Sequence, residues 1–112
     1  MFLALNRSAV VVTPREPFVA WVRGLDEDSQ DITAAEICQP ALYLLPECED
    51  DDRLLALLRK AGKRIFEEQL EAWCQDPSSW PIDRSFDVFQ QWFEFHQFTL
   101  ILDTCRKPLK RD

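Results

Sequence analysis

The side chains best suited to chemistry are scattered along the 112-residue chain and form no compact motif. The one histidine, His96, is followed by Asp103 and Cys105, which are residue types used in nucleophilic catalysis. Neighbouring residues of a strand point to alternate faces, however, so the nearness of Asp103 and Cys105 to His96 along the chain is weak evidence that they work with it. A helix that reaches His96 places it on the apolar side, where a hydrogen-bonded structural role is the commoner one. We therefore predict no catalytic residue and favour a protein that is not an enzyme.

Metal and nucleotide sites are also disfavoured. The four cysteines include no C-x-x-C pair, and zinc sites need ligands in close local pairs. The acidic stretches "DEDSQD" and "ECEDDDR" lack the glycine that a calcium loop needs at its sharp turn. Gly24 and Gly62 are the only glycines, so no glycine-rich loop is present to hold a phosphate. We expect reduced thiols, no metal and no cofactor.

Three polar side chains in otherwise apolar motifs suggest an alternative function. Arg7 precedes an apolar strand, Glu47 follows another, and Arg84 lies between two apolar segments. A guanidinium can bind a carboxylate or a phosphate of a ligand. If the three side chains converge at the strand ends, they form the cleft of a small ligand-binding domain or enzyme. If each has an internal partner, their role is structural, which is the account we favour.

The charge distribution argues against nucleic acid as a partner. The chain carries a formal charge of −7, and its last seven residues, "RKPLKRD", contribute four basic groups and one acidic group. Residues 1–105 therefore carry −10, and so acidic a body repels a phosphate backbone. We predict one globular domain over residues 1–105 and a frayed basic tail over residues 106–112.

The sequence also argues against a membrane location. No apolar run approaches the roughly 20 residues that a spanning helix needs. The apolar start has its charge, Arg7, inside the run, whereas a signal peptide places positive charge before it. These features predict a cytoplasmic protein without membrane contact.

Hydrophobic periodicity predicts alternating strands and helices. Residues 7–14 and 41–47 are apolar runs that end at proline, typical of buried strands. Between them, residues 14–25 have apolar side chains at helical spacing, and Thr33 with Glu36 forms a capping box for a short helix. Residues 48–74 form the longest amphipathic pattern and predict a long helix that begins with acidic residues.

The end of the chain predicts an aromatic helix followed by a strand. Asp83 or Ser85 can cap a helix over residues 86–95, with aromatic side chains on half of its circumference. Residues 98–104 then form a third strand. The predicted fold is α/β, a single two-layer sandwich of order β-α-(short α)-β-α-α-β. Its small three-stranded sheet contains at least one parallel pair, because a helical connection joins the first two strands.

Residues 76–98 contain two tryptophans and five phenylalanines, more aromatic surface than any other part of the chain. Most of these rings are expected in the core. Trp80 and Trp92 are the candidates for a partner-binding surface, because a small sheet hides few tryptophans and interfaces are enriched in them.

Four motifs resemble those of a family of small bacterial proteins of uncharacterised function. They read "NRSAVVVTPREPFVAW", "YLLPECEDDD", "IFEEQLEAW" and "WPIDRSFDVFQQWF" and cover almost the whole chain. The resemblance implies a bacterial cytoplasmic domain and adds no ligand or catalytic residue. The function that we predict is a non-enzymatic protein-interaction module or regulator, which binds a protein partner or itself as a homodimer.

Overall fold

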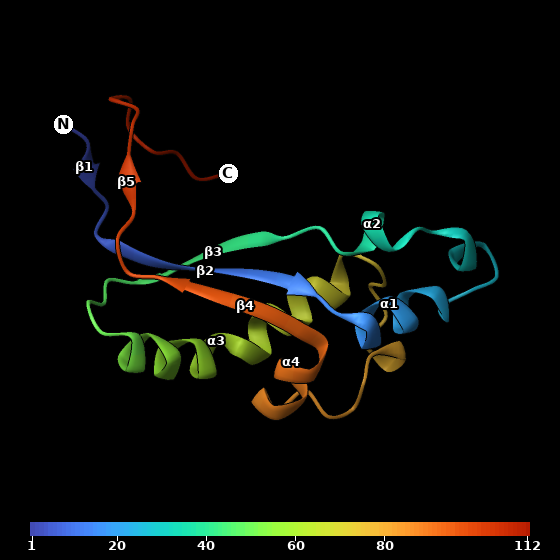
Figure 1. The fold of residues 1–112 in the computed structure, drawn as a ribbon. Coiled ribbons are helices and arrows are strands. Elements are labelled where there is room, and N and C mark those ends of the chain that lie inside the picture. Colours follow the sequence, from blue (N-terminus) through green and yellow to red (C-terminus); the bar gives the residue numbers. More distant parts are fainter.

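The computed structural model describes residues 1–112 and centres on a three-stranded antiparallel sheet (Figure 1). Strand β2 (Arg7–Pro14) lies in the middle, between β3 (Ala41–Pro46) and β4 (Phe93–Phe98). The β-branched residues of β2 suit this central place, since such side chains pack well on a surface that has neighbours on both sides. The predicted mixture of helices and strands is confirmed.

The predicted parallel pair is wrong. The chain leaves β2 at one end of the sheet and enters β3 at the same end, so these two strands run antiparallel. Strand β3 begins opposite Val12 and ends opposite Arg7. Between the strands, α1 (Glu16–Arg23), the 3-10 turn η1 (Asp28–Asp31) and α2 (Ala34–Ile37) lie beyond the end of β2 (Figure 1). Helix α1 is about 12 Å long and β2 about 26 Å, so this helix does not carry the chain back along the strand.

Two helices cover one face of the sheet, which we call the inner face. They are α3 (Asp51–Glu71) and α4 (Phe86–Trp92), and both lie below the sheet in Figure 1. The long amphipathic helix is thereby confirmed, and its buried residues include Leu54, Leu58 and Phe66. None of the helices combines the length and apolar character needed to cross a membrane.

Side-chain caps begin three of the helices, two of them at residues that the sequence predicts, Thr33 and Ser85. The Thr33 hydroxyl accepts a hydrogen bond from the Glu36 backbone N–H, and the Glu36 carboxylate accepts one from the Thr33 N–H. Ser85 Oγ accepts a hydrogen bond from the Val88 N–H at 3.4 Å, and Asp50 caps α3 through the N–H of its second residue. These caps satisfy backbone donors that a helix leaves unpaired at its start.

The third strand lies earlier in the chain than we predicted. Helix α4 ends at Trp92, and the next residue, Phe93, already has extended backbone angles and begins β4. Residues 98–104 are therefore not the third strand of this sheet. Apart from Phe98, the last residue of β4, only Leu102–Asp103 of that range form a strand, the short β5. His96 consequently lies on a strand opposite Val11 and not on the apolar side of a helix.

The two ends of the chain form a small arm of their own. Strands β1 (Leu3–Ala4) and β5 (Leu102–Asp103) pair antiparallel, and the Leu5 N–H donates to the Ile101 carbonyl at 2.8 Å. The arm rises from one end of the sheet, on the side opposite α3 and α4 (Figure 1). The radius of gyration is 15.9 Å, against about 13 Å for a compact domain of this length, because the arm extends away from the body.

Candidate functional site

The aromatic side chains of the C-terminal half form the core between the inner face and the helices. Phe66, Phe89 and Phe93 are fully buried, with centroid separations of 5.2 Å between Phe66 and Phe93 and 5.0 Å between Phe89 and Phe93. Phe18 joins them from α1, at 5.3 Å from Phe93. These rings stabilise the fold by burial and are closed to a ligand.

Trp80 and Trp92 are half-buried and contact this core. Trp92 lies with its ring centroid 5.4 Å from that of Phe66 and 6.2 Å from that of Phe18. The Trp80 indole N–H donates to the Cys74 carbonyl at 2.8 Å, and the Arg84 guanidinium lies 5.8 Å from the Trp80 ring centroid. Both indoles therefore have structural contacts within the chain, and only part of each ring is exposed.

Arg7, Arg84 and Glu47 lie apart and share no hollow. The Arg84 guanidinium donates to the Pro81 carbonyl at 2.6 Å. Its Nε lies 3.6 Å from a Glu67 carboxylate oxygen on α3. Arg7 donates to the Asn6 carbonyl and side chain at the start of β2.

Glu47 lines a separate hollow at the start of α3 among other acidic residues. Its lining residues are Glu47, Cys48, Glu49, Asp50 and Arg53. Arg7 lines a different hollow, and Arg84 lines neither of the two. The geometry does not bring the three side chains to one binding cleft.

The candidate catalytic groups also remain separate. His96 is exposed on β4, with Nε2 3.3 Å from a Glu94 carboxylate oxygen. Cys105 is exposed beyond β5, and the buried Cys48 thiol donates to the Asp50 carbonyl at 3.1 Å. No group of three or more His, Cys, Asp and Glu side chains is placed to hold a metal ion.

A tyrosine joins the sheet to α3 and is the side chain with the largest change in proton affinity. The Tyr43 hydroxyl donates a hydrogen bond to the Glu68 carboxylate, and Gln69 donates to the same hydroxyl at 2.7 Å. Burial, and then the hydrogen bond to Glu68, raise the pKa of Tyr43 above its ordinary value. The effect is to hold the hydroxyl neutral, which suits a structural donor and not a base.

The second face of the sheet, which we call the outer face, is not covered by any helix (Figure 1). Its side chains alternate with those of the inner face along each strand. They come from Arg7, Ala9, Val11, Thr13, Leu42, Leu44, Pro46, Glu94, His96 and Phe98. Leu42, Leu44 and Phe98 are 58%, 48% and 46% exposed, so large apolar side chains on this face contact water.

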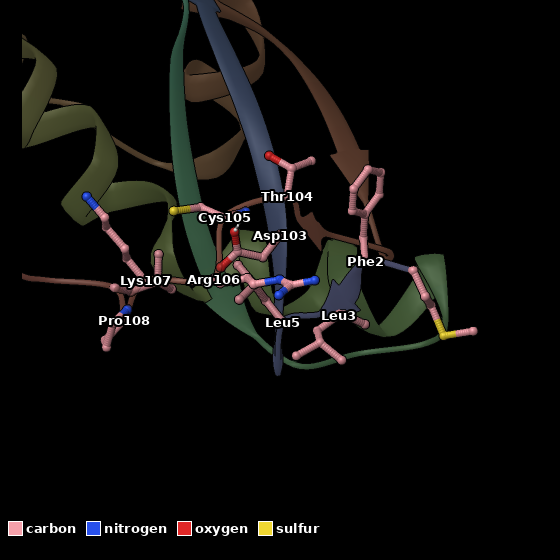
Figure 2. Close-up of a pocket in the computed structure, with 12 residues that line it drawn as sticks. Phe2, Leu3, Leu5, Asp103, Thr104, Cys105, Arg106, Lys107 and Pro108 are labelled. Carbon is pink, nitrogen blue, oxygen red and sulfur yellow. Dashed lines mark hydrogen bonds between the residues drawn. The ribbon is translucent and has the colours of Figure 1, made fainter.

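The arm presents a second apolar surface next to the outer face. Figure 2 shows Phe2, Leu3 and Leu5 near the segment from Asp103 to Pro108, around a hollow of about 710 Å³. A smaller hollow of about 240 Å³ joins the arm to the outer face, since Leu5, Arg7, Leu44 and Leu109 all line it. The two surfaces are therefore continuous.

The outer face does not stand out in the sequence. Residues 42–45 are all apolar, so the pattern of β3 does not show which side chains are covered. The one indication in the sequence is the continuous apolar run of β3, which gives both faces of the strand apolar side chains. In a three-stranded sheet with few helices, one of these faces is left uncovered.

Comparison with known proteins adds no relative. No family model, no curated protein and no solved structure matches this chain. The resemblance to the bacterial family described above therefore remains a prediction.

Proposed function

We propose that this protein is a non-enzymatic protein-interaction module whose binding surface is the outer face of the sheet. The observation that carries the proposal is the exposure of Leu42, Leu44 and Phe98 on a face that no other element covers. Exposed apolar side chains that are adjacent on a rigid sheet are typical of protein-interaction sites. Covering them transfers apolar surface out of water and favours association.

The outer face fits this role better than Trp80 and Trp92 do. Both indoles pack against the core of the chain, and Trp92 lies against the rings of Phe18 and Phe66. The side chains of Leu42 and Leu44 have no such partners on their face of the sheet. A partner therefore gains more by covering β3 than by contacting the tryptophans.

The alternative of a small ligand-binding domain or enzyme has less support. Arg84 has structural contacts with Pro81 and Glu67, and Arg7 and Glu47 line different hollows. Tyr43 is held neutral by burial and by Glu68. The serine hydroxyls that donate to a carboxylate, Ser29 to Asp26 and Ser78 to Asp76, do so in local hydrogen bonds between residues two or three apart in the chain.

The experiment is affinity capture from a lysate of cells that naturally express the protein, with tagged wild type and two variants as baits. Leu44→Glu places a charge on the outer face. Ile82→Glu, at a position that is 98% exposed in a turn away from the sheet, is the matched control. We expect the wild type and the control to retain a partner, including untagged copies of the same chain, and Leu44→Glu to lose it. Equal retention by all three folded baits contradicts the proposal.

A further inference from the structure

We infer that the partner on the outer face is a second copy of this chain, with the two outer faces packed together and each copy's arm beside the far end of the other's sheet. The inference rests on the proposed function, because it takes the same surface and names what covers it. It is carried by the distribution of exposed apolar residues, by the position of the arm and by the charges at the two ends of the sheet.

Nine of the ten large apolar side chains that the chain exposes belong to the arm or to the outer face. Six lie in the arm and its flanking segments: Met1, Phe2, Leu3, Leu100, Leu102 and Leu109. Three lie on the outer face: Leu42, Leu44 and Phe98. Only Ile82 lies elsewhere. So strong a concentration on one continuous surface is expected where that surface is covered in the assembled protein.

The arm needs a partner for its own stability. It consists of two strands of two residues each, and an isolated two-stranded ribbon is marginally stable in water. Leu3 and Leu102, in its two strands, are 76% and 50% exposed. Packing against another apolar surface supplies the burial that the arm lacks within its own chain.

The shape of the molecule sets how two copies fit together. The arm rises from one end of the sheet on the side of the outer face (Figure 1). Two outer faces can pack together around a two-fold axis without collision of the arms only if the arms lie at opposite ends of the assembly. Each arm then lies beside the far end of its partner's sheet.

The charges at the two ends match this arrangement. The segment after the arm carries Arg106, Lys107, Lys110 and Arg111. At the opposite end of the sheet, the connection between α1 and α2 carries four acidic side chains and no basic one in residues 26–31. The only contact within the chain between a guanidinium or ammonium group and a carboxylate joins Arg84 to Glu67, so these basic and acidic groups are free to pair between copies. Such complementarity favours a specific orientation of the two partners.

The test is sedimentation equilibrium of the purified full chain over micromolar to millimolar concentrations. We expect a monomer–dimer equilibrium in the wild type and in Ile82→Glu. Leu44→Glu and Leu102→Glu each place a charge in the proposed interface and are expected to raise the dimer dissociation constant about thirtyfold or more. Circular dichroism and thermal melting of every variant establish that the body remains folded.

A second measurement fixes the orientation. Equal amounts of ¹⁵N-labelled and unlabelled protein are mixed and treated with a carbodiimide, which joins amines to nearby carboxylates. Mixed-isotope peptides that link Lys107 or Lys110 to residues 26–31 are the expected result. A dimer that is unaffected by Leu44→Glu and Leu102→Glu, or that lacks these links, overturns the inference.

The outcome separates this inference from the proposed function. A chain that stays monomeric at every concentration, yet captures a different protein that Leu44→Glu loses, overturns the second-copy inference and leaves the proposed function standing. A monomer whose outer-face variant captures the same proteins as the wild type overturns both.

Discussion

The Tyr43 hydroxyl donates a hydrogen bond to the Glu68 carboxylate and thereby joins the edge strand β3 to the C-terminal half of α3. Gln69 donates to the same hydroxyl at 2.7 Å, so one side chain connects the strand to two successive residues of the helix. Since β3 also supplies Leu42 and Leu44 to the outer face, this contact holds the proposed binding surface to the body.

Tyr43→Phe tests the strength of that connection. The substitution retains the ring and removes the hydroxyl, which leaves Glu68 and Gln69 without their partner. We expect the free energy of unfolding to fall by about 1 kcal/mol, measured by urea denaturation at neutral pH. An unchanged free energy would show that the two hydrogen bonds are fully replaced by water.

The pH dependence of stability follows from the same residue. Because the folded-state pKa of Tyr43 is raised, its contribution to stability is fully present below the unfolded-state value of about 10 and is lost as pH rises through the folded-state pKa. Tyr43 is the only tyrosine, so its ionisation can be followed by ultraviolet absorbance. We expect tyrosinate to form in the native protein only well above its ordinary pH range. Ionisation of Tyr43 near its ordinary pKa of about 10 would contradict the burial of its hydroxyl.

The close approach of Gly62 to Phe86 predicts a second stability effect. A Cβ built on Gly62 would lie 3.1 Å from Phe86 Cδ1, closer than ordinary contact. Gly62→Leu is therefore expected to destabilise the protein by about 1–3 kcal/mol through overpacking of α3 against α4. The double variant with Phe86→Ala should cost less than the sum of the two single changes. Strict additivity in the double-mutant cycle would show that Phe86 is not the obstacle.

The tryptophans give a further prediction, because the structure assigns them different contacts. Trp92→Ala removes a ring that packs against Phe18 and Phe66, and should lower the free energy of unfolding by about 2–4 kcal/mol. Trp80→Phe keeps an aromatic ring but removes the N–H bonded to the Cys74 carbonyl and part of the ring surface, so about 1–2 kcal/mol is expected. Chemical denaturation of both variants measures the difference. If both variants lost a negligible and equal amount of unfolding free energy, the two indoles would be surface residues that a partner could contact.

Elements with a strong periodic pattern could be predicted from the sequence. Residues 51–71 show the spacing of one apolar helix side, and the run from Arg7 to Pro14 is too rich in β-branched residues for a surface loop. Thr33 and Glu36 determine a cap by local hydrogen bonds alone. In each case the physical cause lies within a few residues of the chain.

The strand direction and the last strand could not be predicted, because they depend on packing between distant segments. The parallel or antiparallel choice depends on where α1 and α2 pack, which no local pattern fixes. At the end of α4, the spacing of Phe86, Phe89 and Phe93 fits a helix, whereas Phe93 and Phe95 also alternate as in a strand. Pairing with β2 decides in favour of the strand.

The outer face was equally hidden in the sequence. Leu42 and Leu44 resemble buried residues in composition, and only the placement of the helices on one side of the sheet leaves them exposed. The arm strands are two residues long and produce no periodic signal. Arg84, in contrast, was expected to bind either a ligand or an internal partner, and Glu67 on α3 is the internal partner that the structure provides.

The most direct test of the outer face as the binding surface uses the only histidine of the chain. His96 lies on the outer face opposite Val11 and is exposed, so its imidazole C–H resonances report on whatever covers this face. Proton NMR is recorded while association, with a second copy or with a captured partner, is followed by light scattering. Our account predicts that the His96 resonances shift or broaden in parallel with association. Association that leaves these resonances unchanged, while the indole N–H signals of the tryptophans move, would contradict it.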